Sequence, residues 1–507
     1  MMSMPLSAQV NHHAQRNPGK VALIEGLRKL TYAELNEQAQ AGAVFLQEKG
    51  ILPGHRVAIL APSSIDWIVS YLAIQYCGAT AVPLNSKLTP ADIAAEVSLT
   101  EPSLVLVHPD MDEELAANIP RECKVLLGGD SNHSHESLFQ RFRGLAPDVV
   151  VERTQTQVIL FTGGTTGVQK GVMLSHENIF WNTLQLVIDT EMHEDDVTVL
   201  ATPLHHAGAL VIWLIPHLYL GATAVILPQY STEGLLEVIA RDKVTNGWTP
   251  PSMTRDILTH PLSRSLDLSS FQRWYVAGGP FPARDRDEMK ALIPGVKIVY
   301  QYGLTEAGVM VTVLKDKDYH LAPNSIGRPF MNCDVKILRE DLSDAAVGEV
   351  GEIAVRSPSL MQGYYNRPDA TAEAFHDGWL RTGDLGAMDE LGFISFHDRL
   401  KDMVKTGGFN VYSQEVEAIL QRHPAVREAA VFGMPSEQWG EEVVAVVVVR
   451  DGETASEADI LGFGKEHLSR YKVPKRIFFL SYEELPVNYS GKIVKKELRE
   501  RFRGNAA

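Results

Sequence analysis

The sequence is poor in cysteine, in long apolar runs and in positive charge. Its three cysteines, far apart in 507 residues, fit neither a zinc site nor a disulfide framework, so we expect a reducing, cytoplasmic setting. No segment approaches the ~18 consecutive apolar residues of a membrane span, and the first residues lack the pattern of a secretory signal. A net charge of −16 argues against a general nucleic-acid-binding protein.

The chain is long enough and apolar enough for more than one folded core. Up to about residue 330, β-rich runs alternate with helical stretches, which predicts buried, largely parallel strands with crossover helices. Shorter strands and turns then predict mixed antiparallel structure, and the last hundred residues predict a compact α+β unit. The expected strands are 56–60, 104–107, 158–161, 222–227, 298–300, 335–338, 351–356, 392–397 and 443–449, with helices at 414–421 and 457–470.

A loop rich in glycine and threonine, ending in a lysine, follows the predicted strand 158–161. Its candidate anion-binding residues are Thr162, Gly163, Gly164, Thr165, Thr166, Gly167 and Lys170. Glycines let backbone N–H groups converge on an anion, hydroxyls add donors and the lysine adds charge. The spacing differs from that of a Walker loop. By itself the pattern is as compatible with an ordinary glycine-rich turn as with a phosphate site.

Two acidic motifs and one late lysine add candidates, each with a structural alternative. Thr305 and Glu306 follow the predicted strand 298–300 and have the donors that Mg²⁺ prefers, or they begin a helix. Asp384 follows Gly383 and can accept both hydroxyls of a ribose, or it is a turn residue. Residues 398–408 are charged and contain paired glycines, which predicts an exposed, bendable connection. Lys492, on a turn, would by default be a solvated surface lysine.

The order and spacing of these motifs, with residues 78–85 and 364–368, strongly resemble the adenylate-forming superfamily of acyl-CoA synthetases, firefly luciferases and nonribosomal-peptide adenylation domains. The resemblance covers nearly the whole chain. It implies an α/β fold: a large N-terminal domain, residues 1–400, of mixed sheets with flanking helices plus a β-rich subdomain, and a small mobile α+β domain, residues 401–507. It also implies an acid:CoA ligase that uses ATP, Mg²⁺ and CoA. A fatty or aryl acid becomes acyl-AMP with release of pyrophosphate, and the acyl group then passes to the CoA thiol.

The same resemblance assigns roles to individual residues. The loop from Thr162 to Lys170 cradles the β- and γ-phosphates, and Thr165 and Glu306 hold Mg²⁺. The remaining nucleotide contacts are Gly278, Gly279, Pro280, Tyr302 and Gly303 at the adenine, and Asp384 with Arg399 at the ribose. Lys492 bridges the substrate carboxylate and the α-phosphate during adenylation; the other catalytic candidates are His206, Thr305, Glu306 and Arg399. Lys401 matches the hinge between domains, and Lys405, Gly407 and Gly408 match the CoA side, with Gly408 along the pantetheine tunnel.

The acyl pocket is predicted from fewer residues. His206 matches a histidine that borders the acyl site, whereas His205 is as well explained by a structural role. Gly208 stands where many aryl-CoA ligases have an aromatic residue, so it is expected to open space. Gln301 replaces a common glycine and either narrows the pocket or hydrogen-bonds a polar substrate. The aspartate that holds an amino group in amino-acid-activating relatives is absent here, which favours an acid without one.

Some residues depart from the family pattern. Gly163 replaces a commoner serine, Val168 and Gln169 replace the usual pair before Lys170, and Ser413 stands where proline is frequent. Two alternatives to the CoA ligase stay open: an acyl-AMP ligase that loads a carrier-protein thiol, and a non-catalytic ATP-binding protein. The predicted partners are a carboxylic acid, ATP and CoA, without nucleic acid or an integral membrane segment, and a homodimer is compatible with the sequence.

Overall fold

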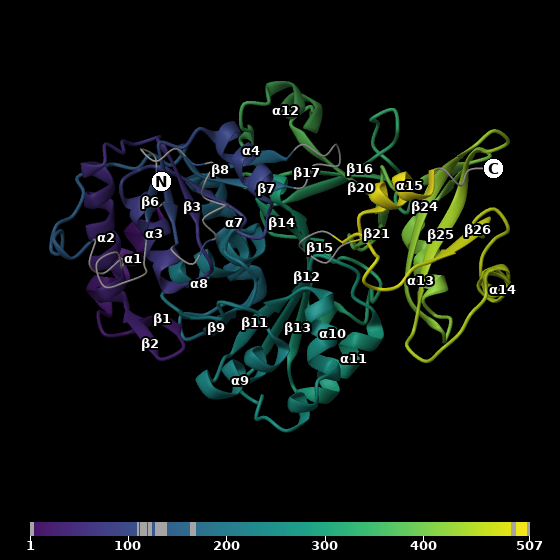
Figure 1. The fold of residues 1–507 in the computed structure, drawn as a ribbon, viewed down its shortest axis with the longest axis horizontal. Helices are drawn as coiled ribbons and strands as arrows, with labels where there is room; N and C mark the ends of the chain where they lie inside the picture. Colours follow the sequence, from purple (N-terminus) through teal and green to yellow (C-terminus); the bar gives the residue numbers. More distant parts are fainter. Residues whose placement is uncertain are drawn as a thin grey trace. The chain divides into compact units, whose positions relative to one another are not determined.

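The computed structural model describes residues 5–108, 111, 119, 124–126, 139–162, 169–487 and 493–503. The chain forms two compact units: Met1–Val335 with Val355–Leu380, and Lys336–Ala354 with Arg381–Ala507. We refer to them as the first and second units. No described helix is both long and apolar enough to cross a lipid bilayer. The predicted α/β class, with mixed sheets and a C-terminal α+β region, is confirmed (Figure 1).

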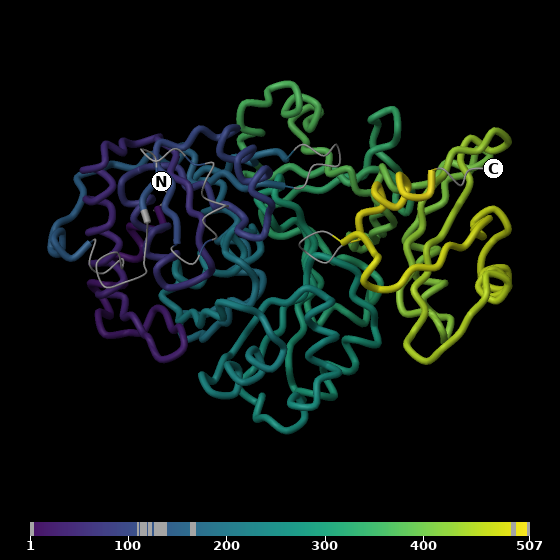
Figure 2. The backbone as a smooth tube through the Cα atoms, in the orientation of Figure 1, coloured from purple at the N-terminus to yellow at the C-terminus, as the bar shows by residue number. Residues whose placement is uncertain are grey.

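The largest sheet of the first unit has nine strands in the order β15-β14-β13-β12-β11-β9-β10-β1-β2. Its strands are β1 (Val21–Glu25), β2 (Arg28–Thr31), β9 (Val197–Leu200), β10 (Thr223–Ile226), β11 (Asn246–Thr249), β12 (Arg273–Ala277), β13 (Lys297–Leu304), β14 (Val309–Leu314) and β15 (Arg328–Pro329). The run from β1 to β13 is parallel, and β14 and β15 extend it with antiparallel pairing. β1, early in the chain, pairs with the much later β10; Figure 2 traces the backbone from purple at the N-terminus to yellow at the C-terminus.

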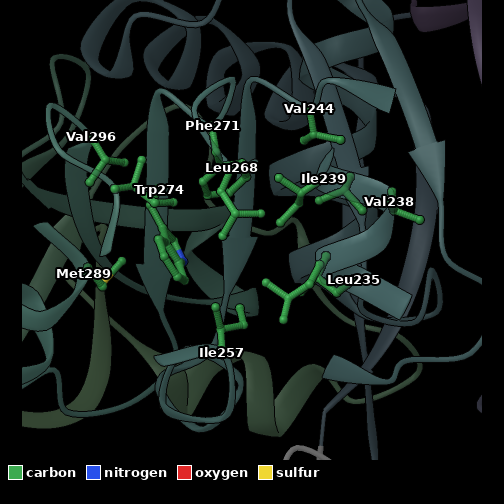
Figure 3. Packing of buried hydrophobic residues seen from close by; sticks show 14 of the residues in the cluster. Leu235, Val238, Ile239, Val244, Ile257, Leu268, Phe271, Trp274, Met289 and Val296 are labelled. Carbon is green, nitrogen blue, oxygen red and sulfur yellow. The ribbon is translucent and has the colours of Figure 1, made fainter. Parts of the chain in front are cut away.

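Apolar residues on three helices and one sheet face form a large core of this unit. Trp274 on β12 belongs to this core and lies edge-on to Phe271 with ring centroids 5.4 Å apart (Figure 3). The helices are α9 (Thr232–Asp242), α10 (Pro251–Thr259) and α11 (Ala283–Leu292). Fully burying each such large side chain contributes roughly 1.5–3 kcal/mol. This packing fixes the strands β12 and β13, whose carboxyl ends carry predicted site residues.

The second sheet of the first unit has seven strands in the order β18-β8-β7-β4-β3-β5-β6. They are β3 (Arg56–Leu60), β4 (Thr80–Pro83), β5 (Leu104–Val107), β6 (Lys124–Leu126), β7 (Thr156–Thr162), β8 (Lys170–Ser175) and β18 (Gly363–Tyr364). The helices that complete the unit are α1 (Leu6–Arg16), α2 (Tyr32–Glu48), α3 (Ile65–Tyr76), α4 (Pro90–Thr100), α7 (His176–Thr190), α8 (Ile215–Leu220) and α12 (Pro368–Ala374). Thr31 and Glu34 form a capping box at the start of α2.

Two smaller sheets complete the chain, and both contain the predicted antiparallel pairs. One holds β16 (Asp334–Leu338), β17 (Gly351–Arg356), β19 (Phe375–His376), β20 (Trp379–Met388) and β21 (Ile394–Arg399). The other holds β22 (Val404–Thr406), β23 (Phe409–Val411), β24 (Val426–Ser436), β25 (Gly440–Val449) and β26 (Arg476–Phe479). Beside the latter lie α13 (Ser413–Leu420), α14 (Glu457–His467) and α15 (Lys495–Phe502). The expected helices and strand of the last hundred residues are confirmed.

Candidate active site

Lys170, Tyr364 and Glu306 form one cluster in the first unit. The Lys170 Nζ lies 4.6 Å from the centroid of the Tyr364 ring, and the Tyr364 hydroxyl donates to the Glu306 Oε1 at 3.1 Å. Burial, with the Glu306 carboxylate alongside, raises the pKa of Tyr364, so its hydroxyl stays a neutral donor. Tyr364 was absent from the predicted site residues, although it belongs to the motif 364–368. A cation and a carboxylate held by one ring are suited to a phosphate and its counter-ion.

The glycine- and threonine-rich loop connects two antiparallel strands. Thr162, the last residue of β7, pairs with Lys170, the first residue of β8. The predicted position after a strand is therefore confirmed, whereas β8 was not among the expected strands. The predicted residues between these strands lie outside the described part of the chain: Gly163, Gly164, Thr165, Thr166 and Gly167.

Glu306 is placed by a tight turn that only glycine permits. After β13, a 3₁₀ turn (Thr305–Ala307) leads to Gly308, where a Cβ would lie 1.8 Å from the Ser359 carbonyl oxygen. The next residue, Val309, has a φ of 110°, which a β-branched residue rarely adopts. Such strain concentrates at functional sites. The turn thus fixes the backbone on both sides of the carboxylate.

The residues present fit the predicted magnesium ion. Within the described ranges no group of three or more His, Cys, Asp or Glu side chains is placed to hold a metal. Mg²⁺ is usually held by one or two carboxylates together with substrate phosphates. The Glu306 carboxylate, whose one oxygen accepts from Tyr364, provides such a donor. The second predicted ligand, Thr165, is outside the described residues.

The predicted adenine contacts lie at the carboxyl ends of adjacent parallel strands. Ala277 on β12 is in register with Gln301 on β13, which brings Gly278 and Tyr302 to the same edge. Gly278 has a φ of 92°, and a Cβ added there would meet no atom within 4 Å. The Tyr300 hydroxyl donates to the Gly279 carbonyl at 3.0 Å, and Pro280 follows directly. The space beside Gly278 is therefore open for a flat ring to approach the backbone.

The predicted end of strand 298–300 is wrong. β13 continues to Leu304, so Tyr302 and Gly303 are strand residues paired with Thr312 and Met310 of β14. Antiparallel pairing with β14 extends the strand beyond Tyr300, and a local sequence pattern does not reveal such pairing. At Gly303 a Cβ would lie 1.7 Å from the Val309 carbonyl oxygen, so glycine is required by this close approach.

On the acyl side, Trp248 fills the space beside Gly208. A Cβ on Gly208 would lie 3.0 Å from the Trp248 Cη2, which contradicts the expectation that Gly208 opens space. The aromatic ring is supplied by β11, a strand that no sequence pattern connected to this position. Burial lowers the pKa of His206 to about 4, so its imidazole is neutral near pH 7. Burial also lowers the pKa of His205, and its Nε2 has no hydrogen-bond partner in the described structure.

Gln301 is the most deeply buried predicted residue on this side, with 1% of its surface exposed. Neither its Oε1 nor its Nε2 has a hydrogen-bond partner among the described residues, and the same holds for the Trp248 Nε1. Trp248 is in register with Tyr275 and Tyr275 with Val299, so Trp248 and Gln301 lie on one face of the sheet. Buried polar groups without partners are rare and call for an explanation.

In the second unit, Asp384 and Arg399 face each other across two antiparallel strands. They are paired residues of β20 and β21, and the Arg399 Nε lies 3.6 Å from the Asp384 Oδ1. Asp384 is 9% exposed, and its backbone N–H donates to the Thr382 Oγ1. Its alternative role as a turn residue is therefore wrong, because the strand continues through it to Met388. The two predicted ribose contacts are brought together by strand pairing.

The predicted connection 398–408 is only partly an exposed link. Asp398 is buried and Arg399 ends β21, whereas Lys401 is exposed on the turn that leads to β22. The carbonyl of Lys401 accepts from the Arg499 Nη2 at 3.4 Å. Pairing of β21 and β22 with their neighbours shortens the free segment to a turn of a few residues.

Gly407 and Gly408, on the predicted CoA side, form the turn between β22 and β23. Their φ values are 55° and 81°, in the left-handed region. Trp439, which was absent from the predicted site residues, packs against Gly407, because a Cβ added at Gly407 would lie 2.9 Å from the Trp439 Cε3. A Cβ added at Gly408 would meet no atom within 4 Å. Lys405 pairs with Glu340 at 2.9 Å. Lys492 lies outside the described residues.

A cavity of about 450 Å³ lies elsewhere in the first unit, lined by residues of η3 (Pro261–Arg264) and α11 among others. None of the predicted site residues lines it. The strand-end residues, rather than this cavity, therefore define the candidate site.

Comparison with known proteins agrees with this geometry. The AMP-binding enzyme family matches residues 10–365, and the AMP-binding enzyme C-terminal domain matches residues 415–492. A feruloyl-CoA synthase from Amycolatopsis sp is 34% identical over 502 residues, covering 99% of this chain and all of the relative. The crystal structure of ATP-bound MatB from Rhodopseudomonas palustris is 30% identical with a TM-score of 0.90, covering 99% of both chains. O-succinylbenzoate coenzyme A synthetase from Bacillus subtilis, in complex with ATP and magnesium, is 28% identical with a TM-score of 0.86, covering 98% of this chain and 99% of that one.

The matches extend over both compact units; ATP is bound in both solved relatives, and magnesium in the O-succinylbenzoate coenzyme A synthetase. The predicted class, an ATP-dependent acid:CoA ligase that forms an acyl-AMP and uses ATP, Mg²⁺ and CoA, is confirmed by them. The chain therefore belongs to the AMP-binding enzyme family.

Proposed function

We propose that the acid activated by this enzyme is an aryl acid with a polar ring substituent, with ferulate as the lead substrate. The buried amide of Gln301, which has no partner among the described residues, carries this proposal. A substrate hydroxyl or methoxy oxygen would satisfy it, and the Trp248 indole would stack on the ring. The 34% identity to a feruloyl-CoA synthase supports the same class. A fatty acid would leave the Gln301 amide unsatisfied, which costs about 1–3 kcal/mol.

The adenylation step requires two anions to meet, and the chain supplies positive charge and alignment for them. Lys170 would steady the β- and γ-phosphates. Glu306, which directly follows Thr305, would hold Mg²⁺ together with Thr165. That ion, when bound, neutralises phosphate charge. Tyr364 orients the Glu306 carboxylate through the hydrogen bond described above.

Asp384 and Arg399 would fix the ribose, and Lys492 would lie between the acid carboxylate and the α-phosphate. Positive charge at that point stabilises the transition state as the carboxylate oxygen attacks and pyrophosphate leaves. His206, neutral near pH 7, would border the acyl group without adding a charge.

Transfer to CoA requires Lys492 to leave the site, so we assign the hinge to Lys401 and the mobile domain to residues 401–507. Gly408, with open space beside it, would let the pantetheine arm pass. Lys405 and Gly407 would line the same side. A carrier-protein thiol is the alternative acceptor, and homodimer formation is a separate proposal.

We place the enzyme in the cytoplasm. Cys77 and Cys333 are both free and buried, and burial raises the pKa of their thiols to about 12 and about 11. Such thiols are poor nucleophiles and do not form disulfides readily.

A substrate panel tests the proposed acid. Pyrophosphate release should be measured with ferulate, cinnamate, benzoate, hexanoate, palmitate and succinate, each with CoA, with a phosphopantetheinylated carrier protein or with neither. Ferulate with CoA should give the highest kcat/KM. Gln301→Leu should lower the ratio of kcat/KM for ferulate over cinnamate roughly tenfold while the cinnamate rate is kept. Preference for palmitate, or an equal loss for both aryl acids, would reject the proposal.

A further inference from the structure

Ser413, which replaces a frequent proline, makes two hydrogen bonds that proline cannot make. Its backbone N–H donates to the Asp398 Oδ2, and its Oγ donates to the Asp398 Oδ1 at 3.0 Å. Both residues are buried, Ser413 completely and Asp398 with 1% of its surface exposed. Proline has neither an N–H nor a hydroxyl. The serine therefore joins the start of α13 to the end of β21 within the second unit.

Lys495 extends this connection to α15. Its Nζ donates to the Ser413 Oγ at 2.6 Å and pairs with the Glu417 Oε1 at 2.7 Å. The side chains of Lys495 and Glu417 are only 12% and 15% exposed. Partial burial makes such a pair costly to break, because removal of one partner leaves an uncompensated charge.

The anchored helix begins directly after the segment that carries Lys492. Lys495 is the first residue of α15, three positions beyond Lys492 in the sequence. Farther along α15, the Arg499 Nη2 pairs with the Asp402 Oδ1 at 3.1 Å. Asp398 directly precedes Arg399, the partner of Asp384. The contacts thus connect the proposed ribose-binding pair to the helix that follows the proposed catalytic lysine.

We infer that Ser413 and Lys495 are positioning residues for adenylation: with Asp398 and Glu417 they form a tether that fixes the start of α15, three residues after Lys492, relative to Asp384 and Arg399. The inference rests on the proposed roles of Lys492 and of the Lys401 hinge. Ribose and α-phosphate belong to one nucleotide, so an error in this spacing moves the lysine away from the reacting atoms. A displacement of about 1 Å is enough to cost about 10²-fold in rate.

The proposed rotation at Lys401 would break the tether, because Asp398 precedes Lys401 in the sequence whereas Ser413 and Lys495 follow it. The tether would then act in the first half-reaction only. Loss of the tether should therefore lower the rate of acyl-AMP formation and leave thioester formation from supplied acyl-AMP unchanged. A purely structural role would lower both.

Ser413→Pro is the most direct test, because Ser413 is the first residue of α13, where proline is well tolerated. Acyl-AMP formation is measured by ATP–pyrophosphate exchange with the most active acid of the panel above. Its kcat should fall roughly 10- to 100-fold, while the KM for ATP stays within about twofold of the wild-type value. Thioester formation from the purified acyl-AMP should stay within about twofold. Ser413→Thr keeps the N–H and a hydroxyl and should restore adenylation.

A pair of lysine variants gives a second, independent comparison. Lys495→Met should reproduce the adenylation defect. Lys472→Met is the control and should leave adenylation unchanged, because Lys472 pairs with Glu415, a residue on the same helix as Ser413 but outside the tether. Equal losses in both half-reactions, or no loss in Ser413→Pro and Lys495→Met, would overturn the inference. Lys492→Ala, measured alongside, separates the two claims: full adenylation in that variant would reject the proposed role of Lys492 itself.

Discussion

The two compact units hold their site residues in different ways. In the first unit, polar groups stand at strand ends, and several, such as Gln301 and the Trp248 Nε1, have no partner in the described structure. In the second unit, the site charges are paired with one another, as in Asp384 with Arg399 and Lys495 with Glu417. Unpaired buried groups are suited to ligand recognition, whereas paired charges preserve their own geometry. We interpret the first unit as the half that recognises the acid, and the second as the half that holds paired charges and carries Lys492.

Removal of Lys492 should break this division of labour most severely. Lys492→Ala is expected to lower acyl-AMP formation about a thousandfold or more, because no other charge replaces it between the carboxylate and the α-phosphate. Thioester formation from supplied acyl-AMP should be nearly unchanged. The two rates can be measured by pyrophosphate exchange and by thiol consumption. An equal loss of both would assign the lysine a different role.

One buried group in each unit should contribute to stability with opposite pH dependence. Burial lowers the pKa of His176 in the first unit to about 4, so only the unfolded chain takes up a proton between pH 6.5 and 4. That residue should cost up to about 3 kcal/mol of stability as the pH falls through this window. Burial raises the pKa of Glu417 in the second unit to about 7, so its contribution to stability falls as the pH rises from 4.5 to 7.

Hydrogen exchange from about pH 4.5 to 8 would measure both effects, since it reports each unit separately. His176→Gln should reduce the loss of stability of the first unit as the pH falls from 6.5, and Glu417→Gln should reduce the loss of stability of the second unit as the pH rises from 4.5 to 7. A variant whose pH dependence equals that of the wild type would show that its buried group does not contribute.

A proline at the proposed hinge should separate the half-reactions in the other direction. Lys401→Pro fixes φ on the turn between β21 and β22 and is expected to lower thioester formation roughly thirtyfold, with a smaller effect on adenylation. Separate half-reaction assays would show this. Matched losses would place the hinge elsewhere.

The smallest expected effect concerns the cluster in the first unit. Tyr364→Phe removes the hydroxyl that donates to Glu306 and should lower adenylation roughly fivefold to tenfold. Tyr365→Phe is the matched control, because the ring of Tyr365 packs near the Arg56 guanidinium, 5.5 Å from its centroid. If both variants lose the same activity, ring packing rather than the hydroxyl is responsible.

Much of the fold was predictable, because buried strands such as Arg56–Leu60 and Leu104–Val107 are continuous apolar runs that local patterning identifies. The end of β13 and the whole of β20 were not, since both depend on pairing with antiparallel neighbours through glycine-containing sequence. Tyr364 and Trp248 were missed for a related reason: each reaches its neighbour from a distant strand. The unusual Ser413 could be identified in the sequence, but its partners Asp398 and Lys495 could not.

The kind of chemistry can be read along the chain, because a reaction between a carboxylate and ATP needs positive charge, a metal-binding carboxylate and phosphate-binding turns, and because the order of these motifs resembles that of a known superfamily. The surroundings of these residues follow from the tertiary fold instead. The ring that bridges Lys170 and Glu306, the indole over Gly208 and the tether at Ser413 each depend on strand pairing and helix packing between residues far apart in the sequence. Local propensity sets which residues are available, and long-range packing sets which of them meet.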